Sequence, residues 1–453
     1  FRKENIPLLT EERKLSSEYN RIIGAQTVIW QGEERTLEQM RTVFQTMDRE
    51  VRQRAWHAMA ERQVQDRQAI NQLWEKFMRV RGELYQNAGM ESYRAYRWKQ
   101  MLRLDYTPQD SQQFDRAILE VVVPAATRVY ERNRQKLGVE RLRPWDLDLD
   151  LYPLDLPALA SYGSVENLKS TAETIFRRID PALGDYFHTM RSENLLDLEN
   201  RKGKAPGGYC TAFPVAKRPF IFMNAVGVPG NVRTILHESG HAFHNFERFE
   251  LPYTQQRFPG LEFSEVASMS MELLSAPFLS VDQGGFYSPE EATRARISHL
   301  EHILIFWPYM AVVDAFQHWL YEHHDLASNP SNCDAKWLGL WEQYIPGVDW
   351  SDLKAQAMTG WHRKQHIHRA PLYYVEYGVA QLGAVQVWRN AMQDQQQTVK
   401  RYRHALSLGG TVSLPELFQA AGAKLAFDAE TLGQAVELIE GKIQELETAL
   451  RPS

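Results

Sequence analysis

Two histidines stand four residues apart in the stretch His237-Glu238-Ser239-Gly240-His241. Side chains four apart on a helix point the same way, so His237 and His241 are spaced to bind one metal ion. Glu238, between them, is placed to act as general base on a metal-bound water. The chemistry expected of this pattern is hydrolysis of a peptide or similar amide bond, with zinc as the preferred metal.

The segment from Asn231 to Asn245 has the pattern of a single helix, and Asn231 is expected to cap its N-terminus. Apolar residues recur along it and would bury the helix at Ile235, Leu236, Ala242, Phe243 and Phe246. The alternative is an ordinary core helix whose two histidines are satisfied by hydrogen bonds. A third metal ligand would distinguish the two interpretations.

A second helical stretch, residues 261–274, carries three carboxylates: Glu262, Glu265 and Glu272. Glu265 and Glu272 are seven residues apart and therefore share a helix face. A catalytic zinc usually has three protein ligands and one position open to water, so one of these glutamates is the expected third ligand.

Three separated segments resemble the thimet oligopeptidase, neurolysin and oligoendopeptidase F family of zinc metallopeptidases, with the oligoendopeptidase F branch the most similar. Residues 237–244 match its HExGHxxH element. Residues 265–272 match its ExxS segment with a second glutamate seven residues after the first. Residues 366–378 match its His and Tyr segment, and residues 48–52 are among the weaker similarities upstream.

The resemblance implies a zinc-dependent endopeptidase with one zinc ion per chain, held by His237, His241 and Glu265. A zinc-bound water would attack the substrate carbonyl, with Glu238 as general base. The developing charge on the carbonyl oxygen would be stabilised by His366, Tyr374 and Tyr377. Tyr374 and Tyr377 are three residues apart and are expected to share a helix face.

Two further residues are expected to support the metal ligands from behind. Glu272 would accept the second ring proton of a zinc-binding histidine, a frequent role of carboxylates near metal sites. His244, seven residues after His237, would act in the same way or serve as an alternative ligand. Their alternatives are a solvated helix carboxylate and an ordinary core histidine.

The pattern changes from helical to extended between Lys202 and Asn224, which predicts a β-hairpin. An exposed edge strand beside the active-site helix can pair with an extended peptide of any sequence. The residues expected to bind substrate are Gly207, Gly208, Tyr209 and, near the C-terminus, Tyr373. A hairpin without substrate contact is the alternative.

The fold class expected is mainly α. Helix signals include capping boxes at Thr36 and Ser413, and a long helix that begins at Thr107 and is kinked at Pro124. The resemblance implies a helical clam with a deep channel and a small sheet beside the metal-binding helix. We expect an N-terminal lobe, residues 1–195, with a truncated start as one interpretation, and a catalytic lobe, residues 196–453, joined as one continuous unit.

Composition excludes several classes of function. The 453 residues carry a net charge of −5 with basic residues interspersed, which argues against nucleic acid or anionic membranes as partners. The apolar run 303–313 contains Pro308, is too short to span a bilayer and is expected to be a buried helix. Two cysteines, Cys210 and Cys333, are too few for a disulfide framework, so a cytoplasmic location is expected.

Oligopeptides are the expected substrates, and the sequence does not indicate the oligomeric state. An exopeptidase of the same chemistry, a dipeptidyl carboxypeptidase or an aminopeptidase, is the main alternative. Arg363, Lys364 and Arg369 could anchor a C-terminal carboxylate in that case. A peptide-binding protein without catalysis is a further alternative. The histidines between residues 299 and 324 lack metal-site spacing and are expected to be ordinary core and surface residues.

Overall fold

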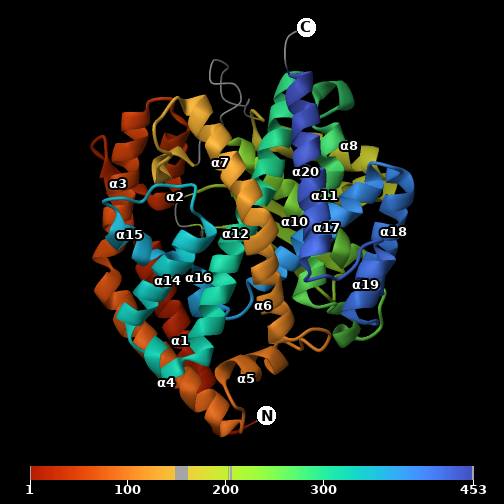
Figure 1. Ribbon diagram of the computed structural model, residues 1–453. Helices are drawn as coiled ribbons and strands as arrows, with labels where there is room; N and C mark the ends of the chain where they lie inside the picture. The colour runs from red at the N-terminus through yellow and green to blue at the C-terminus, as the bar shows by residue number, and fades with distance from the viewer. Residues whose placement is uncertain (1, 148–161, 202–203, 205–206, 451–453) are drawn as a thin grey trace. The chain divides into compact units, whose positions relative to one another are not determined.

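Helices make up most of the regular structure in the computed structural model (Figure 1). It describes residues 2–147, 162–201, 204 and 207–450. The mainly α class that the sequence predicts is confirmed. None of the described helices combines the length and the apolar character needed to cross a bilayer.

Residue contacts divide the chain into two units, and each unit combines two separate stretches. Unit 1 comprises Phe1–Leu154 and Leu304–Val375. Unit 2 comprises Asp155–Ile303 and Glu376–Ser453. This division differs from the continuous lobes expected from the sequence, which met after residue 195.

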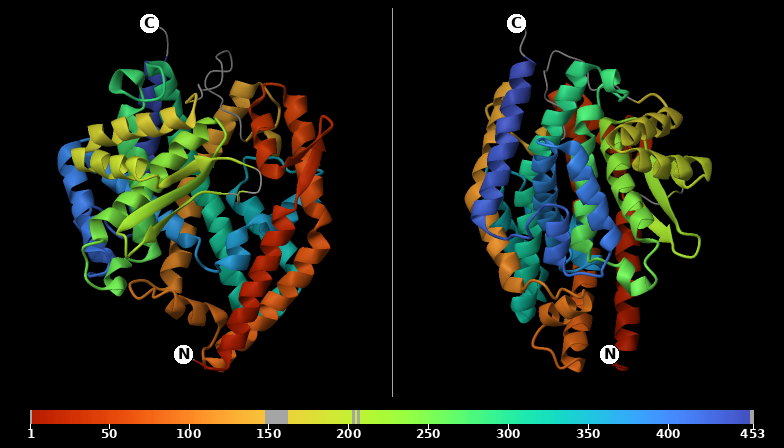
Figure 2. Two further views of the ribbon diagram at one scale, coloured as in Figure 1. Left: turned by 180° about the vertical axis from the view of Figure 1, so that it is seen from behind. Right: turned by 90° about the vertical axis from the view of Figure 1, so that its right-hand side faces the viewer.

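Unit 1 is discontinuous because its second stretch is bonded to its first through buried polar groups. Helix α1 (Asn5–Gly24) lies along α4 (Arg67–Asn87), as Figure 2 shows. The fully buried guanidinium of Arg81 on α4 donates to Glu12 of α1 and to the backbone carbonyl of His368. Leaving those buried groups unpaired would be costly, so the two stretches fold as one body.

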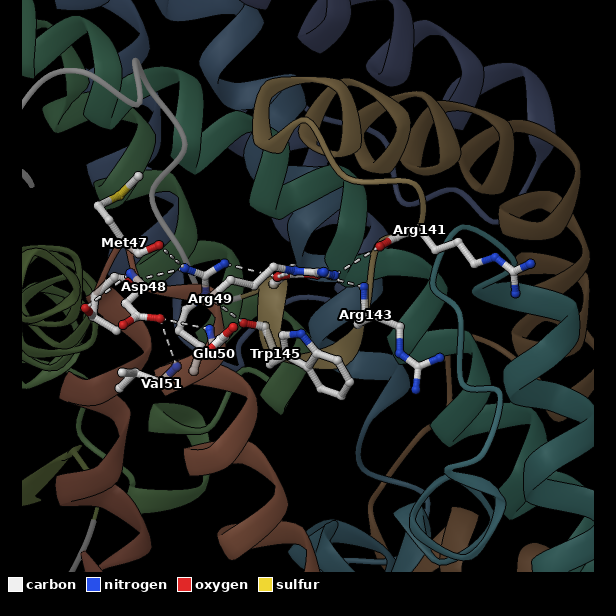
Figure 3. Close-up of polar contacts among 11 residues, drawn as sticks. Met47, Asp48, Arg49, Glu50, Val51, Arg141, Arg143 and Trp145 are labelled. Atoms are coloured by element: carbon white, nitrogen blue, oxygen red, sulfur yellow. Dashed lines mark hydrogen bonds and ion pairs between the residues drawn. The ribbon is translucent and has the colours of Figure 1, made fainter. Parts of the chain in front are cut away.

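A second buried ion cluster in unit 1 explains the upstream similarity at residues 48–52 (Figure 3). Asp48 caps helix α3 (Arg49–Gln65) by accepting two backbone N–H groups of its first turn. Arg49 and Arg52 both donate to the unexposed carboxylate of Asp146, at 2.7 and 3.1 Å. The segment therefore fixes the start of α3 and neutralises a buried charge.

Other elements of unit 1 connect these helices. They are β1 (Thr27–Trp30), β2 (Glu33–Thr36), α2 (Leu37–Met40), η1 (Arg41–Gln45), α5 (Tyr93–Gln100), α6 (Pro108–Ala117), η2 (Ile118–Val122), α7 (Val123–Leu137), η3 (Pro144–Asp146), α13 (His324–Ala327), α14 (Pro330–Tyr344), α15 (Lys354–Met358), η7 (Gly360–Arg363) and α16 (Gln365–Arg369).

Unit 2 contains the predicted hairpin, which is confirmed for its described residues. Strand β4 (Tyr209–Phe213) pairs antiparallel with β5 (Arg218–Ala225), and β3 (Leu196–Glu199) pairs parallel on the other side of β5. The strand order β3-β5-β4 makes β4 an edge strand of this sheet. Alternate residues of β5 are buried, which gives the sheet one face toward the core.

The remaining bounds of unit 2 are as follows. Its elements are α8 (Val165–Ile179), α9 (Pro181–Ser192), α10 (Pro229–Arg248), η4 (Thr254–Arg257), α11 (Leu261–Ser275), η5 (Ala276–Phe278), η6 (Val281–Gln283), α18 (Gln395–Leu408), α19 (Leu414–Ala420) and α20 (Ala429–Ala449). Helices α12 (Pro289–Glu322) and α17 (Val375–Ala391) carry the chain from one unit to the other.

Most helix signals in the sequence lie where the structure has helix ends. The capping boxes at Thr36 and Ser413 precede α2 and α19. The long helix after Thr107 is interrupted by the π-helical turn Ile118–Val122, just before Pro124, because proline cannot donate a backbone hydrogen bond. The apolar run around Pro308 is confirmed as part of a buried helix, α12.

The helix that carries His237 and His241 begins earlier in the chain than the sequence predicted. Helix α10 begins at Pro229, so Asn231 is not its N-cap residue but lies within its first turn. The Asn231 side-chain oxygen accepts the backbone N–H groups of residues 226, 227 and 228 and the hydroxyl of Tyr162. The Asn231 side chain thus still satisfies the backbone N–H groups that precede the helix, although Asn231 itself lies inside the helix. The helix starts earlier because Pro229 occupies the first helical position, which favours proline.

Helices α10 and α11 touch backbone to backbone at Gly240. A Cβ atom at this position would lie 2.6 Å from the Ser268 Cα and 2.7 Å from the Ala267 carbonyl oxygen. Tyr402 of α18 donates its hydroxyl to the same Ala267 carbonyl at 2.8 Å and holds α11 from the other side. The glycine in the HExGH pattern therefore sets the distance between two helices rather than contributing chemistry.

We predict that Gly240→Ala lowers the free energy of unfolding by about 1–3 kcal/mol, because a methyl group there forces the two backbones apart. Urea unfolding monitored by circular dichroism measures the change. Gly230→Ala is the matched control, since it lies on the same helix and a Cβ there meets no atom within 4 Å. Equal stability of the two variants would contradict the proposed close contact.

Candidate metal centre

Three side chains from α10 and α11 converge as the sequence resemblance implied. The Nε2 atoms of His237 and His241 lie 3.4 and 3.6 Å from Oε2 of Glu265. Among the described residues, these three form the group of His, Cys, Asp and Glu side chains that could hold a metal ion. Of the three glutamates considered from the sequence, Glu265 is the one that meets both histidines.

The donor set fits a zinc ion. Two imidazoles and one carboxylate are the ligands of many catalytic zinc sites, with bonds of about 2.0–2.2 Å. Tetrahedral bonds of that length separate their donor atoms by about 3.3–3.5 Å, which is close to the two distances above. His237, His241 and Glu265 would therefore hold the metal without rearrangement of the two helices.

Helix α11 also supplies hydrogen-bond partners to the rings of both histidines. Nδ1 of His237 lies 2.7 Å from Oε1 of Glu272, and the ring of His241 is hydrogen-bonded to the backbone carbonyl of Ser264. The Ser268 hydroxyl lies 3.1 Å from the Glu265 carboxylate. Such supports fix the ring orientation and the tautomer of metal-binding histidines.

The carboxylates give this cluster a negative charge that favours a cation. Burial opposes ionisation of Glu265, but the neighbouring His241 and His237 outweigh it and lower the pKa of Glu265 to about 2. Burial likewise opposes ionisation of Glu272, and its hydrogen bonds with His237 and His299 nevertheless lower the Glu272 pKa. Burial lowers the pKa of His241 to about 4, which keeps that imidazole neutral and able to bind a metal.

Glu238 lies on α10 between the two histidines, and only 7% of its surface is exposed. Its carboxylate accepts a hydrogen bond from the backbone N–H of Cys210 on the edge strand β4. Its Oε2 atom has no hydrogen-bond partner among the described residues. Burial, opposed in part by the nearby His237, raises the pKa of Glu238 to about 7, a value suited to proton transfer near neutral pH.

The expected substrate strand lies close to this glutamate. Gly207 has a φ of +94°, a conformation that favours glycine, and its carbonyl accepts a hydrogen bond from Asn224. A Cβ at Gly208 would only touch its neighbours, the nearest at 3.4 Å. Tyr209 is half exposed and stacks on Phe222.

His244 is buried in a different environment from the one expected. Its ring packs edge-on against Phe263, and no hydrogen bond joins it to His237, His241 or Glu265 among the described residues. Burial lowers the pKa of His244 well below its usual value. A role for His244 behind the metal ligands stays a prediction.

The His and Tyr segment is held in unit 1 by buried hydrogen bonds. The rings of His366 and Tyr374 lie 4.9 Å apart, and the ring of Tyr373 stacks on His366 at 5.7 Å. Gln317 accepts the backbone N–H of Leu372 at 2.7 Å, in the tight turn that follows Pro371. The structure therefore groups three of the four predicted residues of this segment.

The fourth residue, Tyr377, lies in unit 2 near the start of α17. The expectation that Tyr374 and Tyr377 share a helix face is wrong, because α17 begins only at Val375. Leu372 adopts a φ of +62°, so the chain turns sharply before the helix starts. The roles of these tyrosines stay predictions.

One further residue of this centre, His299, was not predicted from the sequence. His299, at the unit 2 end of α12, has its Nε2 atom 3.1 Å from Oε2 of Glu272. It was expected to be an ordinary histidine because no spacing pattern connects it with Glu272, which lies on a different helix. The only sequence signal was its occurrence in a histidine-rich stretch.

Comparison with known proteins assigns the chain to a family. Residues 43–436 match the profile of peptidase family M3. The chain belongs to peptidase family M3. The resemblance to the oligoendopeptidase F branch is confirmed by solved structures. That of an oligoendopeptidase F from Bacillus anthracis strain Ames has a TM-score of 0.86 and 27% identity, covering 98% of this chain and 76% of that one.

Two further relatives of this family member agree with the assignment. The structure of PZ peptidase A with an inhibitor has a TM-score of 0.91 and 28% identity, covering 98% of this chain and 78% of that one. Oligopeptidase PepF of Bacillus subtilis strain 168 is 23% identical over 68% of this chain and 46% of its own length. The chain thus spans less than half the length of that curated relative.

We predict that Ser268→Ala weakens zinc binding about tenfold, because Glu265 loses a hydrogen bond that holds its carboxylate toward the histidines. Competition of the metal-free protein with a fluorescent zinc chelator measures the affinity. Ser239→Ala serves as the control, since the Ser239 hydroxyl donates to the Ile235 carbonyl within α10 and bonds to none of the three proposed ligands among the described residues. An unchanged affinity for Ser268→Ala would show that Glu265 does not need this support.

Proposed function

We propose that this M3 family member is a zinc-dependent endopeptidase that hydrolyses internal bonds of short oligopeptides. The observation that carries the proposal is the convergence of His237, His241 and Glu265, with the buried carboxylate of Glu238 beside them. When bound, a zinc ion supplies a Lewis acid that polarises the substrate carbonyl and makes a water molecule more acidic.

Glu238 would take the proton of the attacking water and pass it to the leaving amine. Its pKa of about 7 supports both steps, because a group near the working pH can accept and return a proton. The Cys210 N–H holds one side of the carboxylate toward β4, while Oε2 is left without a hydrogen bond from the described residues. That arrangement leaves Oε2 to serve as the base.

The edge strand β4 would align the substrate. In the antiparallel pairing with β5, residues such as Cys210 and Ala212 alternate with Tyr209 and Thr211. The Cys210 N–H points to Glu238 rather than to β5. Backbone groups of successive residues in a strand point in alternate directions, so those of Ala212 also point to the open edge of β4. An extended peptide pairing there through its backbone would lie next to the base, whatever its side chains.

His366, Tyr374 and Tyr377 are proposed to stabilise the charge that develops on the carbonyl oxygen. A donor of this kind is worth about 3–4 kcal/mol in the transition state. Their hydroxyl and imidazole N–H groups have the chemistry required. Substrate binding by Tyr373, next to His366 in the same group of rings, is part of this proposal.

We predict that Glu238→Gln lowers kcat by about 100- to 10,000-fold, because the amide cannot accept the proton of the attacking water. Cleavage of a quenched fluorescent oligopeptide measures the rate, and chelator competition measures zinc. Zinc affinity is expected to stay within about threefold of the parent, since Glu238 is not a ligand. Full activity of this variant would exclude Glu238 as the base.

A carboxypeptidase is the second candidate, and Lys364 is the observation that favours it. Arg363 donates to the Gln356 carbonyl and Arg369 to the Gln365 side chain. The Lys364 ammonium instead lies over the rings of Tyr374 and Tyr309, at 3.7 and 5.0 Å. No acidic partner for it is found in the described residues, and burial lowers its pKa to about 7. A peptide carboxylate would supply the missing negative charge.

Peptides of ten residues with both termini blocked distinguish the two candidates. An endopeptidase is expected to cleave them internally, because its site needs only a backbone, whereas an exopeptidase needs a charged terminus. Mass spectrometry of the products identifies the cleaved bond. Products from free peptides alone would overturn the endopeptidase proposal.

Lys364→Met tests the anchor by comparing peptides that have free C-termini with peptides that have amidated C-termini. If Lys364 is not a terminal anchor, the kcat/KM of this variant changes equally for both kinds of peptide. A loss of about tenfold or more confined to free C-termini would identify Lys364 as the carboxylate anchor of a carboxypeptidase.

A further inference from the structure

A hydrogen-bonded series of three side chains from three helices of unit 2 comprises His299, Glu272 and His237. Nε2 of His299 on α12 lies 3.1 Å from Oε2 of Glu272 on α11. The other oxygen of Glu272, Oε1, lies 2.7 Å from Nδ1 of His237 on α10. The side chains of His299 and Glu272 are only 15% and 11% exposed. This series of hydrogen bonds ends at His237, whose other ring nitrogen faces the proposed metal site.

The direction of these hydrogen bonds follows from the chemistry of the groups. An ionised carboxylate can only accept, so both imidazoles donate to Glu272. His237 then carries its proton on Nδ1 and presents the lone pair of Nε2, the atom 3.4 Å from Glu265. His299 donates from Nε2 in the same way. Glu272 thus selects the metal-binding tautomer of His237 only while its carboxylate stays turned toward that ring.

A glutamate side chain does not hold such an orientation by itself. It has three rotatable bonds, and a carboxylate with one bonded oxygen leaves the other buried and unsatisfied, which favours rotation toward another donor or toward water. The bond from His299 to Oε2 removes that freedom because it satisfies the second oxygen. With both oxygens bonded, the plane of the carboxylate is fixed between α10 and α12.

We propose that His299 is a positioning residue of the metal centre, which holds Glu272 in the orientation that directs Nε2 of His237 toward the metal. This inference rests on the proposed zinc site. It assigns a function to a histidine that acts through Glu272 rather than by binding the metal itself. The competing interpretation is a structural contact that joins α11 to α12 without affecting the metal.

Zinc affinity of the metal-free protein tests the proposal without using activity. We expect His299→Leu to weaken zinc binding by about 10- to 100-fold, the usual effect of removing a support of a metal ligand. His299→Gln is expected to stay within about threefold of the parent, because its amide N–H can still donate to Glu272. His302→Leu, an exposed histidine on the same helix, is the matched control and should bind as the parent does.

A double-mutant cycle shows whether His299 acts through Glu272. Glu272→Ala should weaken zinc binding by itself, and adding His299→Leu should weaken it no further, because the residue that His299 holds is already absent. Additive losses would overturn the proposal in favour of a structural role. Urea unfolding of each metal-free variant establishes that it is folded, and His299→Ala replaces His299→Leu if the latter does not fold.

The outcomes separate this inference from the proposed function. If the parent binds zinc tightly and His299→Leu binds it equally well, the positioning role is wrong and the zinc site stands. If the parent does not bind zinc, the proposed function fails, and this inference fails with it. Loss of affinity in His299→Leu with recovery in His299→Gln supports the positioning role, because a packing defect would not be repaired by an N–H donor.

Discussion

The close crossing of α10 and α11 at Gly240 is the constraint on which the centre depends. A backbone separation that leaves no room for a Cβ brings Glu265 to within 3.4–3.6 Å of two imidazoles on the other helix. At an ordinary helix separation of about 8–10 Å between axes, larger residues fill the interface and hold the backbones further apart. Tyr402, which bonds to the Ala267 carbonyl, holds α11 at this crossing.

The two helices divide the work of the site between them. Helix α10 carries the two imidazoles and the proposed base, whereas α11 carries the proposed third ligand and the groups that bond to the rings. Because Ser264, Glu265, Ser268 and Glu272 all lie on α11, a small shift of this helix would disturb every ligand at once. A centre built in this way binds its metal with little rearrangement, since the ligand orientations are set by protein hydrogen bonds.

Much of the centre could be predicted because its information is local in sequence. The pair His237 and His241 follows from helical spacing, and Glu272 was expected as a support because it stands seven residues after Glu265. His299 could not be found in this way, since its partner is on another helix and no periodicity joins them. The prediction that Tyr374 and Tyr377 share a helix face was wrong because the chain turns at Leu372 before the helix begins. Leu372 has a positive φ, and no glycine at this position indicated the turn in the sequence.

The elements of the fold could also be predicted where they depend on residues that are close in sequence. Helix class and capping boxes are set by residues close in the chain, and the sequence predicted them. The discontinuous units depend on contacts such as that of Arg81 with His368, which are 287 residues apart. Nothing in a single sequence marks which distant carbonyl a buried arginine will find.

The position of Glu238 connects the sheet to the chemistry. A buried carboxylate is costly, and the structure offsets part of that cost through the nearby His237 ring and through one neutral donor, the Cys210 backbone N–H. Burial outweighs both contributions and leaves the Glu238 pKa at about 7, whereas a salt bridge would have lowered the pKa and made the group a weaker base. Because that donor belongs to the edge strand, a peptide that adds to β4 would also be aligned with the base. In the proposed mechanism, substrate alignment and base strength therefore both depend on β4.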